Sequence, residues 1–191
     1  MGKGRLEAFS DGVIAIIITI MVLELKTPQG VGFDALRPLI PVMMSYALSF
    51  IYVGIYWNNH HHMLHAATKV NGRILWANLH LLFWLSLFPF VTSWMGANRF
   101  VAIPVALYGC VLLMAGIAYY ILAHALAAHH GRDSTLALAL GKDFKGLASI
   151  AIYAAAIASA FWNPRIASVL YVAVALMWLV PDRRIEDRLA S

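Results

Sequence analysis

Ionisable residues flank a short apolar stretch near the N-terminus of this 191-residue chain. Arg5, Glu7 and Asp11 precede an uncharged run of twelve residues, Gly12–Leu23, and further charges follow it. A helix that faces lipid needs about 20 apolar residues to cross a bilayer, so this run alone is too short. One helix over residues 5–25 is roughly 30 Å long, and it spans the membrane only if Asp11 lies against protein or water. The alternative is an anchor helix whose charges lie at the two headgroup layers.

The composition is that of an integral membrane protein. Hydrophobic residues make up 62% of the chain, charged residues 12%, and the mean hydropathy is +0.75, whereas soluble domains carry about 25% charged residues. The net charge of +5 comes from basic residues in short loops, with no basic cluster among exposed aromatics, so we expect no nucleic-acid partner. The single cysteine, Cys110, cannot form an intrachain disulfide.

Six apolar segments separated by turn residues predict an all-α membrane protein with a single domain over residues 1–191. A polar stretch that starts at Asn58 and runs to Arg73 is expected to connect the second segment to the third, which has Pro89 near its end. Ser134–Leu140 is interpreted as a short interfacial piece. The six predicted spans cover about residues 5–25, 38–58, 74–95, 100–126, 146–161 and 166–180.

The distribution of Lys and Arg predicts the orientation. If the N-terminus is cytoplasmic, ten basic residues lie inside and four lie outside. Cytoplasmic loops carry an excess of Lys and Arg, and the loops here are short enough for that rule to hold. We therefore expect both termini in the cytoplasm.

Four residues of the first predicted helix share one face. Ile16, Thr19, Ile20 and Leu23 lie at i, i+3, i+4 and i+7, and such positions align on a helix. If several copies of this helix surrounded an axis, the aliphatic residues would form stacked rings with a hydroxyl layer between them. Apolar rings gate by excluding water, and hydroxyls replace part of an ion's hydration shell. Lipid-facing or core aliphatics explain the same spacing, because isoleucine occurs on every side of this helix.

Histidines gather after the second apolar segment. His61 and His65 are four residues apart, a spacing that suits metal binding on a helix, but no cysteine or nearby carboxylate completes a ligand set. We therefore expect no metal or cofactor site, and interpret the group as capping residues or contacts to the first helix. The cluster comprises His60, His61, His62 and His65.

The start of the chain resembles a known family. Its first run is similar to the signature of the lysosomal potassium channel family, transmembrane protein 175 and its prokaryotic relatives, whose mark is Arg-x-x-x-Phe-Ser-Asp in the first helix. The resemblance is densest over residues 1–91. The matching stretches are Arg5-Leu6-Glu7-Ala8-Phe9-Ser10-Asp11, Leu23-Glu24-Leu25, Tyr56-Trp57-x-x-His60-His61, Asn78 and Pro89.

The resemblance implies a single six-helix repeat that assembles as a homotetramer around the first helices. By similarity, the pore constrictions fall on Ile16, Ile20 and Leu23, and Thr19 forms a polar selectivity layer. The implied function is a potassium-preferring, leak-like cation channel with a hydrophobic gate in a prokaryotic cell membrane. Its partners would be further copies of itself, membrane lipid and monovalent cations, with potassium as the permeant ion.

The Phe-Ser-Asp segment is expected to fix the first helix in place. Arg5 lies too far round the helix for a simple same-face pair with Asp11, so the partners of Asp11 are sought on the second and third segments. We interpret Arg5, Phe9, Ser10 and Asp11 as a network that holds the helix in register at the pore entrance. An alternative is that Asp11 concentrates cations there. The partners considered are His60, His61 and Asn78.

Other functions remain open from the residues alone. A haem-binding redox protein would need paired histidines on facing helices, and His80 and His124 are the available pair. A small transporter usually has internal repeats or broken helices, which are not evident here, whereas a proton pathway is open. The chain has no evident nucleophile–base pair and no phosphate-binding loop, so we expect no enzyme activity.

Overall fold

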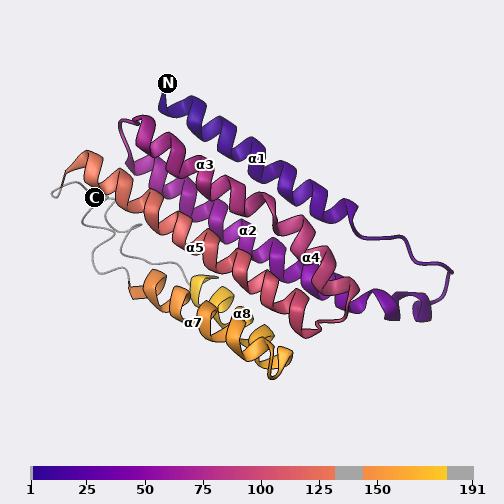
Figure 1. The fold of residues 1–191 in the computed structure, drawn as a ribbon. Helices are drawn as coiled ribbons and strands as arrows, with labels where there is room; N and C mark the ends of the chain where they lie inside the picture. The colour runs from indigo at the N-terminus through magenta and orange to yellow at the C-terminus, as the bar shows by residue number, and fades with distance from the viewer. Residues whose placement is uncertain (1, 132–143, 180–191) are drawn as a thin grey trace.

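The computed structural model describes residues 2–131 and 144–179, and the secondary structure of this described part is helical throughout (Figure 1). Ser134–Leu140, interpreted above as an interfacial piece, lies outside it. The elements in chain order are α1 (Lys3–Leu23), the 3-10 helix η1 (Phe33–Leu39), α2 (Ile40–Ala66), α3 (Gly72–Ser86), α4 (Phe88–Ala97), α5 (Ala102–His130), α7 (Phe144–Ala160) and α8 (Pro164–Leu179).

Within residues 2–131 and 144–179, four helical segments are long and apolar enough to cross a membrane: 3–23, 33–66, 72–97 and 102–130. The helices α7 and α8 are apolar but shorter. The six apolar helical segments confirm the predicted all-α membrane fold.

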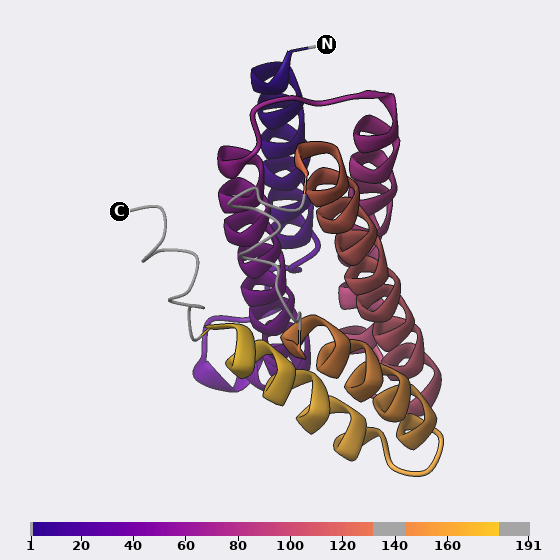
Figure 2. The ribbon, with the colours of Figure 1, turned by 90° about the vertical axis from the view of Figure 1, so that its left-hand side faces the viewer.

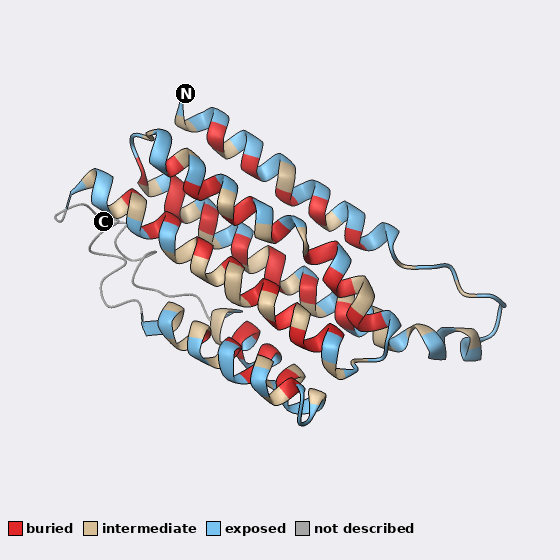
Figure 3. Ribbon diagram, viewed as in Figure 1, coloured by how far each residue is buried: buried red, intermediate tan, exposed pale blue. Residues whose placement is uncertain are grey.

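The helices form a bundle in which α1 lies at one edge and the α7–α8 pair at the opposite edge (Figures 1 and 2). The helix α1 packs on α2, α3 and α4, while α5 packs on α3, α4, α7 and α8. Figure 3 shows that buried residues concentrate in the middle helices and that α1 is buried along one side only. One side of α1 is therefore without a partner within the described part of a single chain.

The second helix is longer than the sequence predicts. It continues to Ala66 before the backbone becomes extended at Ala67, so His60, His61 and His65 lie on the helix. The expectation that the connection starts at Asn58 is therefore wrong. The expectation fails because a drop in hydropathy marks only where a span leaves the apolar layer of the membrane. The helix itself ends where its backbone hydrogen bonding ends.

The third predicted span is a broken helix, which the sequence did not make evident. The helix α3 ends at Ser86 and α4 begins at Phe88, with Leu87 as the shared cap. Pro89 lies in the first turn of α4; because proline lacks an N–H and its ring clashes with the carbonyl four residues earlier, it interrupts a continuous helix there. Hydrogen bonding resumes from the Val91 N–H to the Leu87 carbonyl at 3.1 Å.

Candidate functional site: the first helix and its contacts

The helix α1 has one buried side. Its buried residues recur every three or four positions, as one side of a helix requires, and they face α2, α3 and α4. This side includes one polar residue, Ser10, which is fully buried. The set is Leu6, Ser10, Ile14, Ile17 and Met21.

The stripe singled out from the sequence lies on the exposed side. Ile16, Ile20 and Leu23 are 60%, 43% and 76% exposed, and Thr19 is also exposed. The Thr19 hydroxyl donates to the Ala15 carbonyl at 2.9 Å, so its proton is used within the helix. The hydroxyl oxygen keeps acceptor capacity, and that is the capacity a cation requires.

A buried chain of hydrogen bonds joins the first three helices. Asn78 Nδ2 donates to Ser10 Oγ at 2.9 Å, and Ser10 Oγ donates to the Leu6 carbonyl at 2.8 Å. On its other side, Asn78 Oδ1 lies 2.7 Å from His60 Nε2. Because Oδ1 can only accept, Nε2 carries the proton and donates it. All three side chains are at most 1% exposed, so the chain of bonds fixes α1 against α2 and α3.

Asp11 has a different partner from those considered from the sequence. Its Oδ1 accepts from Trp57 Nε1 at 3.1 Å, whereas His60 and Asn78 join the network through Ser10. His61 stacks on the Trp57 ring with centroids 6.0 Å apart and is thereby linked to Asp11 only indirectly. Trp57 belongs to the Tyr-Trp motif quoted above, but its indole N–H was not recognised as a donor to this carboxylate.

Arg5 and Phe9 lie on the exposed side of α1, away from this network. Within the described ranges Arg5 makes no ion pair; the pair present joins Lys3 Nζ to Glu7 Oε1 at 3.7 Å. Lys3 also donates to the His65 carbonyl at 3.0 Å and so ties the start of α1 to the end of α2. The basic tether at this end of the helix is therefore Lys3, which sequence reasoning missed.

The opposite end of α1 is tied to α4. Ser93 Oγ donates to Glu24 Oε2 at 3.1 Å, and Glu24 is the residue that caps the helix. Together with the Lys3 contacts, this bond anchors both ends of α1 through polar groups. The charges that flank the apolar run therefore anchor the helix at its two ends, with Asp11 between them.

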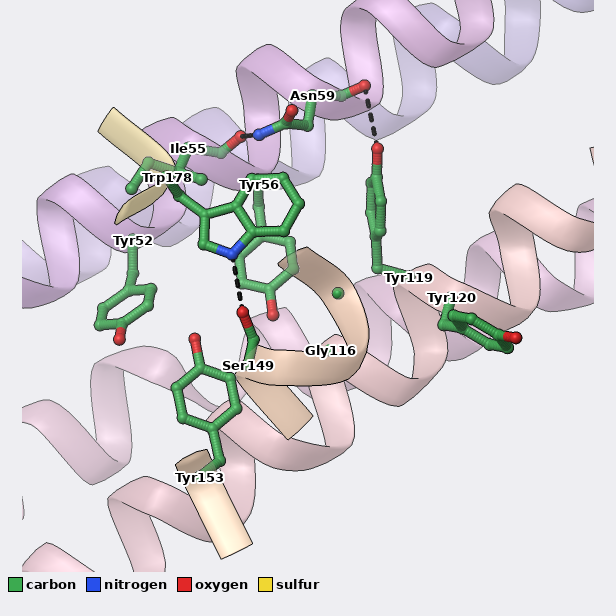
Figure 4. A pocket seen from close by; sticks show the side chains of 11 residues that line it. Tyr52, Ile55, Tyr56, Asn59, Gly116, Tyr119, Tyr120, Ser149, Tyr153 and Trp178 are labelled. Carbon is green, nitrogen blue, oxygen red and sulfur yellow. Dashed lines mark hydrogen bonds between the residues drawn. The ribbon is translucent and has the colours of Figure 1, made fainter. Parts of the chain in front are cut away.

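A small cavity lies on the far side of the bundle, between α2, α5, α7 and α8 (Figure 4). Its volume of about 40 Å³ has room for roughly three waters. Tyr52 and Tyr153 point toward one another across it, and Trp178 Nε1 donates to Ser149 Oγ at 2.8 Å. No sequence pattern predicts this aromatic group. It lies away from the exposed side of α1.

Comparisons with known proteins agree with the resemblance in the N-terminal half. The family model for the endosomal/lysosomal potassium channel TMEM175 matches residues 5–89. A potassium channel of Chryseobacterium sp. (strain P1-3) is 56% identical over 189 residues, which cover 99% of this chain and 98% of that protein. The chain belongs to the TMEM175 family. The TMEM175 relatives are ion channels rather than enzymes.

More distant TMEM175 relatives cover less of the sequence. A potassium channel of Streptomyces collinus is 32% identical over 61% of each chain. A chicken protein named endosomal/lysosomal proton channel TMEM175 is 35% identical over 36% of this chain and 16% of its own length.

The fold is also that of a solved TMEM175 structure. The crystal structure of a lysosomal potassium-selective channel TMEM175 homologue from Chamaesiphon minutus matches with a TM-score of 0.81 and 26% identity. The match covers 93% of this chain and 96% of that one. The family thus extends over the described bundle, including α7 and α8, where the motif resemblance was thin.

In the described part of the chain, the histidines do not belong to a metal-ligand set. Over residues 2–131 and 144–179, no group of three or more His, Cys, Asp or Glu side chains is arranged to hold a metal ion. His61 and His65 instead stack with ring centroids 6.1 Å apart.

Proposed function

We propose that this protein is a potassium-preferring cation channel of the prokaryotic cell membrane, with both termini in the cytoplasm, and that α1 lines its conducting path. The names of the bacterial relatives support the substrate. The single observation that carries the role of α1 is its exposed apolar stripe, which runs along a helix at the edge of the bundle. A stripe that is unpartnered in one chain is what an assembly around a shared axis requires.

The position of Asp11 supports the same assembly. Asp11 is exposed and held by one indole N–H, yet it lies within a helix long enough to span the membrane. A carboxylate at such a position needs protein or water beside it rather than lipid. If copies of the chain contact one another along α1, Asp11 lies beside protein or pore water instead of lipid. In the homotetramer implied by the resemblance, this holds for all four copies of Asp11 around one axis.

The exposed stripe has the chemistry of a hydrophobic gate. Ile16 and Leu23 are seven positions apart, about 10 Å along the helix, so the side chains of Ile16, Ile20 and Leu23 would form successive rings. An ion that passes an aliphatic ring sheds water, and potassium loses its shell at a lower cost than sodium. Thr19, whose oxygen is free to accept, would restore part of the lost coordination.

The buried side of α1 would set which residues face the axis. We assign this positioning role to Ser10, held by Asn78 and His60, and to Asp11, held by Trp57. Arg5 and Phe9 are on the exposed side and would lie at the cytoplasmic entrance. The permeant ion is then the ligand of the site, and conduction along α1 requires no bound cofactor.

Replacement of Thr19 tests this proposal. Purified protein in liposomes, with potassium on one side and sodium on the other, gives a reversal potential that reports the permeability ratio. Thr19→Val removes the hydroxyl at nearly constant shape and should change the ratio, whereas Thr19→Ser keeps the hydroxyl and should preserve it. Identical reversal potentials for the wild type and Thr19→Val would show that the Thr19 hydroxyl does not contact the permeating ion.

A second candidate is proton conduction. The chicken and zebrafish relatives are named endosomal/lysosomal proton channels, and their matches extend over 36% of this chain. Currents in an impermeant cation across a pH gradient separate the two functions. A current that persists without potassium and reverses with the pH gradient would favour protons as the main charge carrier.

A further inference from the structure

A groove of about 620 Å³ lies at the end of the bundle opposite the N-terminus. Three segments far apart in the sequence meet there: the start of α2, the α4–α5 turn, and the α7–α8 turn with the start of α8 (Figures 1 and 2). Its wall is mostly apolar, with two arginines among the lining residues. The residues that matter are Pro41, Met44, Val101, Val169, Arg99 and Arg165.

Among the described residues, no acidic side chain pairs with the two arginines. Both are exposed, and in the part of the chain that the structure describes neither guanidinium group makes an ion pair or a hydrogen bond. The acidic residues of that part, Glu7, Asp11, Glu24 and Asp34, do not line the groove. Two guanidinium groups beside an apolar wall are complementary to a ligand that has an anionic headgroup and an apolar tail.

Arg99 occupies a backbone position that normally favours glycine. The end of α4 is a Schellman motif, in which the Phe100 N–H bonds to the Met95 carbonyl and the Arg99 N–H to the Gly96 carbonyl, both at 3.1 Å. The left-handed residue of this motif is usually glycine, but here Arg99 has φ +52° and Phe100 follows with φ +60°. An L-residue with a long side chain is disfavoured in this region. The arginine is thus present at the rim of the groove against the local backbone preference.

We propose that this groove binds an anionic phospholipid of the surrounding leaflet. The phosphodiester lies between the guanidinium groups of Arg99 and Arg165, and an acyl chain follows the apolar wall past Met44 and Val169. Arginine suits this contact because its planar fork binds phosphate oxygens in pairs. Arg99 lies between two membrane-length helical segments, 72–97 and 102–130, and Arg165 lines the same groove from the start of the shorter helix α8. Both arginines would therefore lie at headgroup depth, beside the exposed apolar side chains of Met44, Val101 and Val169.

Lipid retention measures this site without any current, so its outcome is independent of the proposed channel function. The purified protein in neutral detergent is titrated with phosphatidylglycerol, with phosphatidylcholine, or with inorganic phosphate, and bound lipid is counted by native mass spectrometry. We expect phosphatidylglycerol to bind, and each arginine removed to weaken it about 5-fold, since a basic residue near an anionic headgroup contributes on the order of 1 kcal/mol.

The variants are chosen so that folding is preserved. Arg99→Gly fits the left-handed backbone, Arg165→Gln keeps the side chain polar, and the double variant should bind about 25-fold more weakly. The matched control is Arg37→Gln, an exposed arginine of η1 that does not line the groove; it should bind like the wild type. Thermal unfolding without lipid verifies that all variants are folded.

Several results would overturn the assignment. Equal binding of phosphatidylcholine would mean that the groove recognises acyl chains alone, and equal binding of inorganic phosphate would mean that it is a site for free anions. An equal loss in Arg37→Gln would mean that overall surface charge, rather than the groove, attracts the lipid. Unchanged binding in the double variant would exclude the two arginines, as expected if a second copy of the chain covered this groove.

Discussion

Replacement of Asn78 should loosen the first helix measurably. Asn78→Leu keeps the number of side-chain heavy atoms and the branching, so the change isolates the polar contribution. It removes the bond to Ser10 Oγ at 2.9 Å and the bond from His60 Nε2 at 2.7 Å. Interhelical hydrogen bonds in membranes contribute about 0.6 kcal/mol on average and up to about 1.7, so two bonds contribute about 1–3 kcal/mol. The His60 N–H left buried without an acceptor pushes the loss toward the upper end.

The assay is reversible unfolding in mixed micelles, with the free energy of unfolding compared between variants. Asn98→Leu is the matched control, because Asn98 is the exposed C-cap of α4 and its side chain donates to the Trp94 carbonyl of that helix rather than to another helix. A double-mutant cycle with Ser10→Ala isolates the Ser10–Asn78 bond, whose coupling energy should be about 0.6–1.7 kcal/mol. An Asn78→Leu loss no larger than that of Asn98→Leu, or a coupling energy near zero, would refute the positioning role of this network.

Two other substitutions test the bundle at separate contacts. Gly96→Ala should destabilise the protein by about 1–3 kcal/mol, because its new methyl would lie 2.8 Å from the Val42 Cα and push α2 and α4 apart. The control Gly116→Ala, where the nearest atoms are 3.8 Å away, should be nearly neutral. Equal losses in the free energy of unfolding for the two variants would contradict this steric explanation. His130→Ala should speed hydrogen exchange at two backbone amides of the α2–α3 connection, which donate to His130 Nε2 at 2.9 and 3.2 Å. Unchanged exchange at these amides would show that the histidine does not hold this connection.

The helices were largely predictable because each follows from local sequence. Apolar runs and the turns between them locate the six helical segments, and the ring of Pro89 explains the break in the third one. Helix ends were less predictable. The second helix continues through the histidines to Ala66, because helical hydrogen bonding is indifferent to whether the side chains are apolar.

The partners of the first helix were predictable by type and not by identity. The spacing separates Ser10 from the exposed stripe, and Asn78 and His60 were among the residues expected to contact the signature. Which of them meets Ser10 and which meets Asp11 depends on the rotation of α1 against α2, a tertiary property that no local pattern encodes. The left-handed backbone conformation of Arg99 was not predictable either, because a sequence without glycine at that position does not suggest a Schellman motif.

The two sides of α1 are physically coupled through that rotation. Successive helix residues are about 100° apart, since 3.6 residues make a turn, so a rotation by one residue would carry Ser10 away from Asn78 and turn Ile16 away from its present direction. The network on the buried side therefore determines which side chains the opposite side presents. If α1 lines the conducting path, Asn78→Leu should alter the potassium-to-sodium permeability ratio as well as stability, although Asn78 itself is fully buried. A variant that is less stable but equally selective would mean that the stripe keeps its orientation through other contacts, such as the Glu24–Ser93 bond.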